Sequence, residues 1–197
     1  MIRADKAEQT AIAINKDGGA AIAVAGDVTD SVVIETLVHE AVKFGNGKLH
    51  IIINNAGYAW DDPIDKIKDK QWETIINLHN TAPFKLIRAA APYFMVKDGE
   101  PRSIVNISST SGIYGNAGQA SYALAKAGLV GLTKTMAQEW GPEYGVRANG
   151  TKYVLSRLVV RLMLKLRQLL PSAPFERDSP KLQQANMSCD QMGQNML

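Results

Sequence analysis

Hydrophobic and polar positions alternate in blocks along the first 150 residues, and the blocks have two different periods. Short apolar runs such as AAIAVA at 20–25 and LHIII at 49–53 are typical of buried strands. Longer amphipathic stretches at helical spacing separate these runs. Strands that alternate with helices are typical of an α/β domain with a parallel sheet, and we expect one such domain over residues 1–152.

The boundaries of the expected elements follow from glycines, prolines and capping residues. The pattern predicts helices at 4–17, 31–44, 69–97 and 121–140, and strands at 20–25, 49–53, 103–107 and 146–149. Thr29 or Asp30 can cap the second helix, because both are good N-cap residues. Pro83 and Pro92 fall inside the third helix, where the missing amide of proline predicts kinks.

The character of the chain changes after Gly150. Residues 153–170 are predicted to form an amphipathic helix, and residues 171–197 are polar and expected to be a disordered tail. After residue 150 the chain holds seven Lys/Arg and three Asp/Glu, so the overall charge of +3 comes from this end. The main domain is close to neutral, and no nucleic-acid partner is expected.

Composition excludes several other classes of protein. No apolar run reaches the length that spans a membrane, and the first residues do not resemble a signal peptide, so we expect a cytoplasmic protein without a membrane partner. The single cysteine, Cys189, cannot form a disulfide within the chain. The three histidines, His39, His50 and His79, are scattered without metal-ligand spacing, and no metal site is expected.

The most specific chemistry lies in Ser109, Tyr122 and Lys126. Tyr122 and Lys126 are four residues apart on one predicted helix face, and Ser109 follows a predicted strand. A free tyrosine has a pKa of about 10, and a nearby ammonium favours the phenolate. The Tyr-x3-Lys pair alone is expected roughly 0.4 times by chance, but the serine offset lowers this to roughly 0.02. The three residues therefore predict a tyrosine that acts as an acid and base.

Five motifs in order resemble the short-chain dehydrogenase/reductase family. The motifs are Gly26-Asp27-Val28-Thr29-Asp30, Asn54-Asn55-Ala56-Gly57, Asn106-Ile107-Ser108-Ser109, Tyr122-Ala-Leu-Ala-Lys126 and Val146-Arg147-Ala148-Asn149. The resemblance covers residues from about 20 to 149. It implies a partial Rossmann-type, doubly wound parallel sheet that lacks the first two strands and the last.

The resemblance also implies an activity and a cofactor. A member of this family transfers hydride between NAD or NADP and a small carbonyl or secondary alcohol substrate, with Tyr122 as acid and base, Ser109 orienting the reacting oxygen, and Lys126 assisting Tyr122. The residues implied in cofactor binding are Asp27, Val28, Asn54, Asn55, Ala56, Gly57, Tyr122 and Lys126. His79 aligns with the family's catalytic asparagine, whose backbone carbonyl anchors a water in a proton relay; a structural histidine is the alternative.

Two departures from the family pattern change the expectations. The glycine-rich loop that cradles the pyrophosphate and the last strand are absent, which predicts a truncated member. Without the first two strands, segment 20–25 is expected either to pair with 49–53 through a right-handed crossover or to stay loose.

Three interpretations of function follow from these observations. The first is the NAD(P)-dependent oxidoreductase. The second is a catalytically dead, truncated family member that acts as an interaction module, using the helices near 72–97 and 121–140 to dimerise with a full-length relative. A homo-oligomer through the same two helices is also expected. The third takes helix 153–170 as a membrane-surface or partner-groove element, against the alternative of a lid over the substrate.

Overall fold

The computed structural model of the chain describes residues 4–151, which form alternating helices and strands. The helices are α1 (Ala4–Lys16), α2 (Ser31–Phe44), α3 (Asp69–Ile76), the π-helical segment η1 (Asn77–Thr81), α4 (Ala82–Phe94), α5 (Ser111–Tyr114) and α6 (Ala120–Tyr144). The strands are β1 (Ile51–Asn54), β2 (Arg102–Ile107) and β3 (Val146–Thr151).

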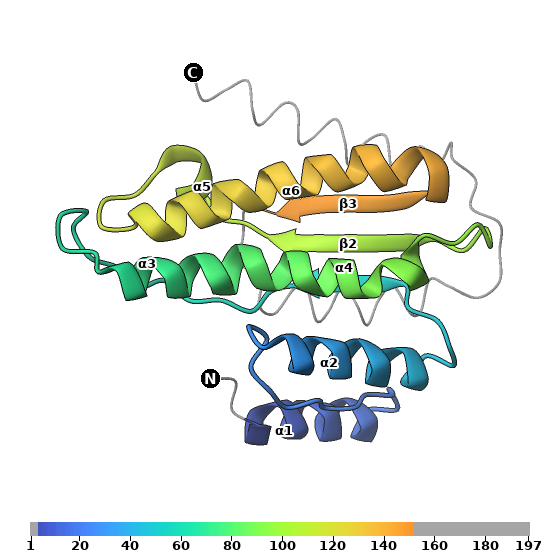
Figure 1. Cartoon of the computed structure of the whole chain (residues 1–197). Coiled ribbons are helices and arrows are strands. Elements are labelled where there is room, and N and C mark those ends of the chain that lie inside the picture. The colour runs from blue at the N-terminus through green and yellow to red at the C-terminus, as the bar shows by residue number, and fades with distance from the viewer. Residues whose placement is uncertain (1–3, 152–197) are drawn as a thin grey trace. The chain divides into compact units, whose positions relative to one another are not determined.

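The three strands form one parallel sheet in the order β1-β2-β3 (Figure 1). In the register, Ile52 lies opposite Ile104, and Ile104 lies opposite Ala148. Because all three strands run in the same direction, their carboxyl ends meet at one edge of the sheet. The expected α/β architecture with a partial Rossmann-type sheet is therefore confirmed, with three strands among the described residues.

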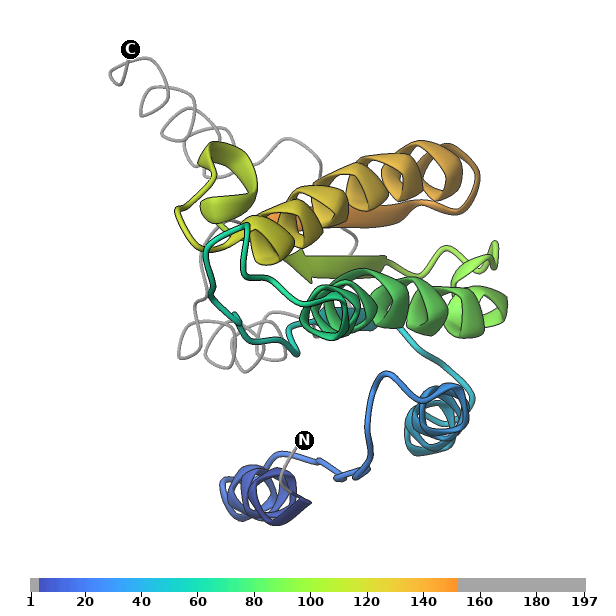
Figure 2. The same ribbon diagram turned by 60° about the vertical axis from the view of Figure 1, so that its left-hand side comes forward.

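The hydrophobic core lies between one face of the sheet and helices α2, α4 and α6. Figure 2 shows α4 and α6 running side by side across this face. The core side chains are Val38, Ile52, Ile87, Ala90, Phe94, Ile104, Met136 and Val146, each at most 6% exposed. Every strand and all three helices contribute to this set, so one continuous core holds the sheet that positions the site.

Asp30, rather than Thr29, caps α2. Its carboxylate accepts a hydrogen bond of 2.9 Å from the amide of Val32, and its backbone is extended, as an N-cap requires. This leaves Asp27, three residues earlier, without a role in capping the helix. The end of α6 is also defined by one residue, since Gly145 takes a left-handed conformation with φ of 67°.

The predicted strand at 20–25 is wrong. The segment has no strand geometry and does not pair with β1, and Ile22 is 47% exposed. The side chain of Asn15 anchors it, because it both accepts from the Ala21 amide and donates to the Ala21 carbonyl. An apolar run becomes a strand only where a neighbouring strand bonds its amides, and the described residues provide none beside it.

The predicted long helix at 69–97 is divided into α3, η1 and α4. The division falls before Pro83, which occupies the first turn of α4. Proline has no N–H, so the carbonyl of His79 lacks the donor that an α-helix would place four residues later. The chain widens to a π-helical turn over 77–81. Pro92, by contrast, lies within α4 without ending it.

The predicted amphipathic helix at 153–170 and the polar tail at 171–197 lie outside the described residues. Over residues 4–151, no helix has the length and apolar character needed to cross a membrane.

Candidate active site

The candidate site residues gather at the carboxyl edge of the sheet. Residues 54–57 follow directly from β1, Ser109 lies two residues beyond the end of β2, and the first turns of α6 carry Tyr122 and Lys126. In parallel α/β sheets this edge is where ligands bind, because loops and helix N-termini surround an open crevice there. The topology therefore brings together residues that are far apart in the sequence.

Lys126 is buried, and both its ammonium group and its backbone carbonyl are hydrogen-bonded. Its side chain is 4% exposed, and Nζ donates to the carbonyl of Ile107 over 2.7 Å. Its own carbonyl accepts a 2.8 Å hydrogen bond from the hydroxyl of Ser108. These two bonds join the end of β2 to α6 and leave Nζ with further N–H donors. Burial lowers the pKa of Lys126 from its usual value to about 8.

Tyr122 is adjacent to both Lys126 and His79. The Nζ atom of Lys126 is 5.5 Å from the centre of the tyrosine ring. The His79 ring meets it edge-on, with centroids 5.3 Å apart and an interplanar angle of 86°. The side chain is half-buried, so one part of it is held by the protein while another can reach a ligand. Tyr122 and Lys126, four residues apart on α6, thus lie beside each other.

His79 is a neutral, buried histidine. It is 1% exposed, and its Nε2 donates to the carbonyl of Tyr58 over 2.9 Å. Burial is the main cause that lowers its pKa to about 4, and the charge of Lys126 acts in the same direction. Because Nε2 holds the proton, Nδ1 is an acceptor, and it has no hydrogen-bond partner within residues 4–151. The histidine ring that contacts Tyr122 therefore carries an unpaired acceptor.

The pKa of His79 predicts a loss of stability in acid. Below about pH 6.5 the unfolded chain binds a proton at this position, whereas the folded chain does so only near pH 4. The free energy of unfolding should therefore fall by about 3 kcal/mol as the pH drops through this window. Denaturant titrations at several pH values should show a smaller decrease in the free energy of unfolding for His79→Gln than for the wild type. For His39→Gln, whose side chain is 74% exposed, the decrease should equal that of the wild type.

Gly57 is required by the position of His79. A Cβ atom at residue 57 would lie 2.1 Å from Cε1 of the imidazole and 2.8 Å from Nδ1. The ring cannot retreat without breaking its bond to the carbonyl of Tyr58. The glycine of the Asn54-Asn55-Ala56-Gly57 motif therefore has a packing function against η1.

Replacing Gly57 by alanine should destabilise the fold by about 1–3 kcal/mol, because the buried ring must shift. The matched control is Gly131→Ala in α6, where a Cβ meets nothing within 4 Å. That substitution should leave stability unchanged or raise it by up to about 1 kcal/mol through helix propensity. Thermal melts of both variants give the comparison, and equal melting temperatures would show that the His79 ring is not held in place.

Ser108 and Ser109, the two serines of the Asn106-Ile107-Ser108-Ser109 motif, have different hydrogen-bond partners. The Ser109 Oγ accepts from the amide of Ser111 over 3.2 Å, which leaves the hydroxyl proton free to donate to a ligand. Ser108 is buried and committed to the Lys126 carbonyl. Ser109 is therefore the serine of this motif that can meet a substrate.

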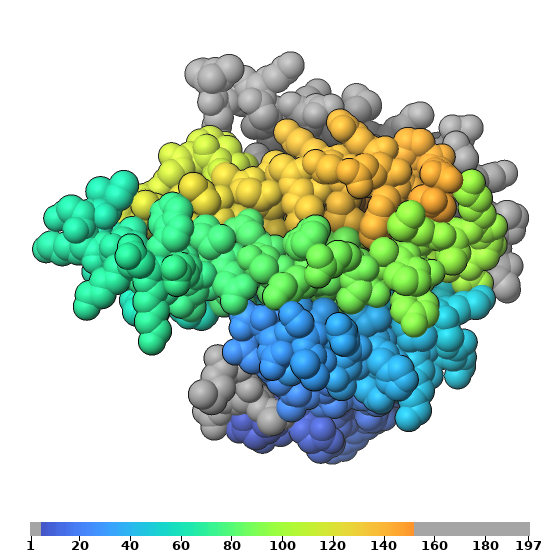
Figure 3. All heavy atoms as spheres, in the orientation of Figure 1, coloured from blue at the N-terminus to red at the C-terminus, as the bar shows by residue number. Residues whose placement is uncertain are grey.

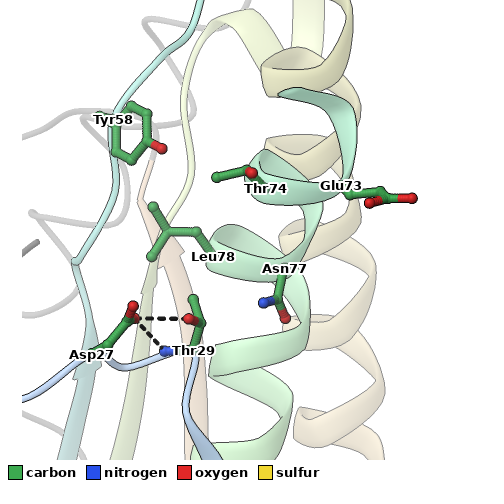
Figure 4. A pocket seen from close by; sticks show the side chains of 7 residues that line it. All are labelled: Asp27, Thr29, Tyr58, Glu73, Thr74, Asn77 and Leu78. Carbon is green, nitrogen blue, oxygen red and sulfur yellow. Dashed lines mark hydrogen bonds between the residues drawn. The ribbon is translucent and has the colours of Figure 1, made fainter. Parts of the chain in front are cut away.

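Five of the eight predicted cofactor residues line two cavities that share Leu78, whereas Gly57, Tyr122 and Lys126 line neither. The larger, of about 430 Å³, is lined by Asp27, Thr29, Tyr58, Glu73, Thr74, Asn77 and Leu78 (Figure 4). The smaller, of about 110 Å³, includes Val28, Asn54, Asn55 and Ala56. In the larger one, Asp27 accepts from the amide and the hydroxyl of Thr29, and these bonds lower the pKa of its carboxyl. Asp27 is thus an oriented, ionised acceptor at the rim.

A chain of polar side chains supports the site, and the sequence did not predict its bonds. Asn54 donates to Asn106 over 2.8 Å, and Asn106 donates to Thr133 over 2.8 Å. Thr133 in turn donates to the carbonyl of Leu129. Asn106 is fully buried, so its complete bonding matters energetically. This chain of bonds ties β1 to β2 and β2 to α6, directly beneath the site.

Comparisons with known proteins show which family the chain belongs to. The profile of the family described as short chain dehydrogenase matches residues 1–155. The chain belongs to the short-chain dehydrogenase/reductase family. It is 39% identical over 151 residues to the hydroxyacyl-CoA dehydrogenase ChsB1 of Mycobacterium tuberculosis, covering 74% of this chain and 47% of the relative. It is 36% identical over 143 residues to the 3-oxoacyl-[acyl-carrier-protein] reductase FabG of Thermotoga maritima, covering 72% and 57%.

A solved structure shows the same fold. A dehydrogenase/reductase from Sinorhizobium meliloti 1021 matches with a TM-score of 0.69 and 29% identity, over 77% of this chain and 58% of the other. The chain therefore spans about half the length of the relatives described here.

Proposed function

We propose that the chain is an NAD(P)-dependent oxidoreductase that interconverts a carbonyl and a secondary alcohol, with Tyr122 as the acid and base. The observation that carries the proposal is the placement of the buried Lys126 ammonium over the Tyr122 ring. A cation in a poorly solvated position stabilises a phenolate far more than one in water does. Family membership supports the same chemistry.

In carbonyl reduction, Tyr122 donates its phenolic proton to the substrate oxygen, and Ser109 donates a hydrogen bond to the same oxygen. The bound nicotinamide would supply the hydride, or accept it in the reverse direction. Lys126 stabilises the phenolate that remains on Tyr122. The carbonyl of His79, which lacks its α-helical donor before Pro83, offers an acceptor for a water that returns a proton towards Lys126.

The residues present fit the two nucleoside ends of the cofactor. Asp27 and the cavity beside it offer an acceptor for an adenine amino group, with Val28 and residues 54–57 forming the adjoining wall. Tyr122 and the remaining N–H donors of Lys126 can hold the nicotinamide ribose. Small side chains at 56 and 57 allow the backbone to approach a ligand closely. The cofactor that we propose is NAD or NADP.

The substrate we propose is a 3-oxoacyl thioester, or the corresponding 3-hydroxyacyl thioester in the reverse direction. The printed names of two relatives support this class, since one is a hydroxyacyl-CoA dehydrogenase and the other a 3-oxoacyl-[acyl-carrier-protein] reductase. Both names describe an acyl chain on a carrier, with a hydroxyl or a carbonyl oxygen that the Ser109–Tyr122 pair could engage.

The test is a spectrophotometric assay of the full 197-residue chain with acetoacetyl-CoA and either NADH or NADPH. Oxidation of one nucleotide that depends on the thioester supports the proposal. Binding of neither nucleotide, measured by the change in nicotinamide fluorescence at high protein concentration, would exclude the proposed activity.

A second candidate is an interaction module that forms a homo-oligomer through α3, α4 and α6. Large apolar side chains are exposed on all three helices: Trp72 is 38% exposed, Phe84 47% and Leu124 52%. Figure 3 shows the atoms of α4 and α6 adjoining one another on the face towards the viewer. A stable dimer in light scattering, together with no nucleotide binding, would favour this function over the enzyme.

A further inference from the structure

The segment from Ala56 to Pro63, here called the β1 loop, is held in place by three side chains and one backbone carbonyl from other parts of the chain. It contains no helix or strand, yet four hydrogen bonds fix it. These are Tyr58 O with His79 Nε2 (2.9 Å), Trp60 O with Gln71 Nε2 (2.9 Å), Asp61 Oδ2 with Gln119 Nε2 (3.0 Å) and the Asp62 amide with Gly118 O (2.9 Å). A loop anchored in this way has few conformations available to it.

Gln119 connects this loop to both catalytic segments. Its Nε2 donates to Asp61, and its Oε1 accepts a 2.9 Å hydrogen bond from the hydroxyl of Ser111. The amide of Ser111 donates in turn to Oγ of Ser109. Gln119 is also the residue immediately before α6, three positions before Tyr122. One carboxamide therefore links the β1 loop, the turn that holds Ser109 and the start of the helix that carries Tyr122.

We propose that Gln119 is a positioning residue for the reaction. It fixes the positions of Ser109 and Tyr122 relative to the β1 loop. The inference rests on the proposed function for its catalytic consequence. Through the loop, Gln119 also supports the carbonyl of Tyr58, which holds the His79 ring against Tyr122. Both ends of the carboxamide are occupied by protein groups, so its effect on a substrate is indirect.

The hydrogen bond between Asp61 and Gln119 can be broken by one substitution and restored by a second, which provides a test of the proposal. Gln119→Glu keeps an oxygen to accept from Ser111, but it removes the donor to Asp61 and places two carboxylates together. Asp61→Asn alone retains an oxygen that can accept from Gln119. In the double variant, the amide introduced at position 61 can donate to the carboxylate introduced at position 119. This restores the hydrogen bond with its polarity reversed.

We expect kcat for acetoacetyl-CoA to fall by about 10- to 100-fold in Gln119→Glu, because misplaced catalytic groups lose rate to this degree. The dissociation constant for the nucleotide should stay unchanged. Asp61→Asn should resemble the wild type, and the double variant should recover most of the lost kcat. If the double variant is no better than Gln119→Glu, or if Gln119→Glu retains full kcat, the inference is overturned.

Hydrogen exchange gives a readout that is independent of turnover. The amide of Asp62 is bonded to Gly118 beside the Asp61–Gln119 pair, and Gln119→Glu should speed its exchange by about tenfold, with protection restored in the double variant. A wild-type chain that binds nucleotide but does not turn over would overturn the proposed function, while the exchange rates still decide whether Gln119 holds the loop. If Gln119→Glu does not fold, Gln119→Met removes both bonds without adding charge and takes its place.

Discussion

Replacing Tyr122 by phenylalanine is expected to lower kcat/KM for acetoacetyl-CoA by about 10³-fold, because the hydroxyl that transfers the proton is lost. The ring itself remains, so its edge-on contact with His79 and its position beneath Lys126 should persist. The folded structure should change little, and nucleotide binding should weaken only by the loss of one hydrogen bond to the nicotinamide ribose. The loss should therefore appear in kcat rather than in KM, as expected for an interaction that acts in the transition state.

The matched control is Tyr144→Phe, at the opposite end of the same helix. Tyr144 lies under the ammonium of Lys97, and phenylalanine keeps that ring. This variant should retain wild-type turnover. If Tyr122→Phe and Tyr144→Phe were equally active, proton transfer would not pass through Tyr122, and the proposed mechanism would be excluded.

The sequence was most informative about functional residues that are neighbours within a single helix. Tyr122 and Lys126 are one turn apart on a single helix, so their spacing alone predicts that they share a face. The burial of Lys126 and its bond to the Ile107 carbonyl depend on how α6 packs against β2. Periodicity describes one element at a time and contains no information on such packing.

The two errors in the expected elements have separate causes. Segment 20–25 has the composition of a strand, but a strand also requires a partner, and partners are a property of the whole sheet. For the helix at 69–97, Pro83 correctly marked an irregularity. It did not show that the chain would widen to a π-helical turn at 77–81, since a missing amide can be accommodated by a kink as well as by a π-helical turn.

The bonds that support the site could not have been identified from a single sequence. Asn54 and Asn106 are 52 positions apart, and Asp61 and Gln119 are 58 apart. Nothing in either local pattern shows that these side chains bond to each other rather than to solvent, as ordinary turn and loop residues do. Only the folded sheet, which brings the ends of β1 and β2 together, turns these polar residues into a support for the catalytic side chains.

Replacing Lys126 by methionine is expected to lower kcat/KM by about 10²- to 10³-fold. Methionine fills a similar volume but lacks the charge that stabilises the Tyr122 phenolate, and groups of this kind are worth that much in rate. It also removes the donor to the carbonyl of Ile107, which should reduce the free energy of unfolding by about 1–3 kcal/mol. The control is Lys134→Met, an exposed lysine two turns further along α6, which should keep full activity.

A pH profile of the rate should show that the charge of Lys126 is the cause of this loss. Its pKa is lowered to about 8 by burial, so the ammonium is present below that pH and is lost above it. Carbonyl reduction by the wild type should therefore decline as the pH rises above about 8. Lys126→Arg keeps a positive charge at all these pH values and should lose this decline, even with a lower maximal rate, because arginine titrates above about 12. An unchanged alkaline decline in Lys126→Arg would assign the titration to another group and remove the ammonium from the mechanism.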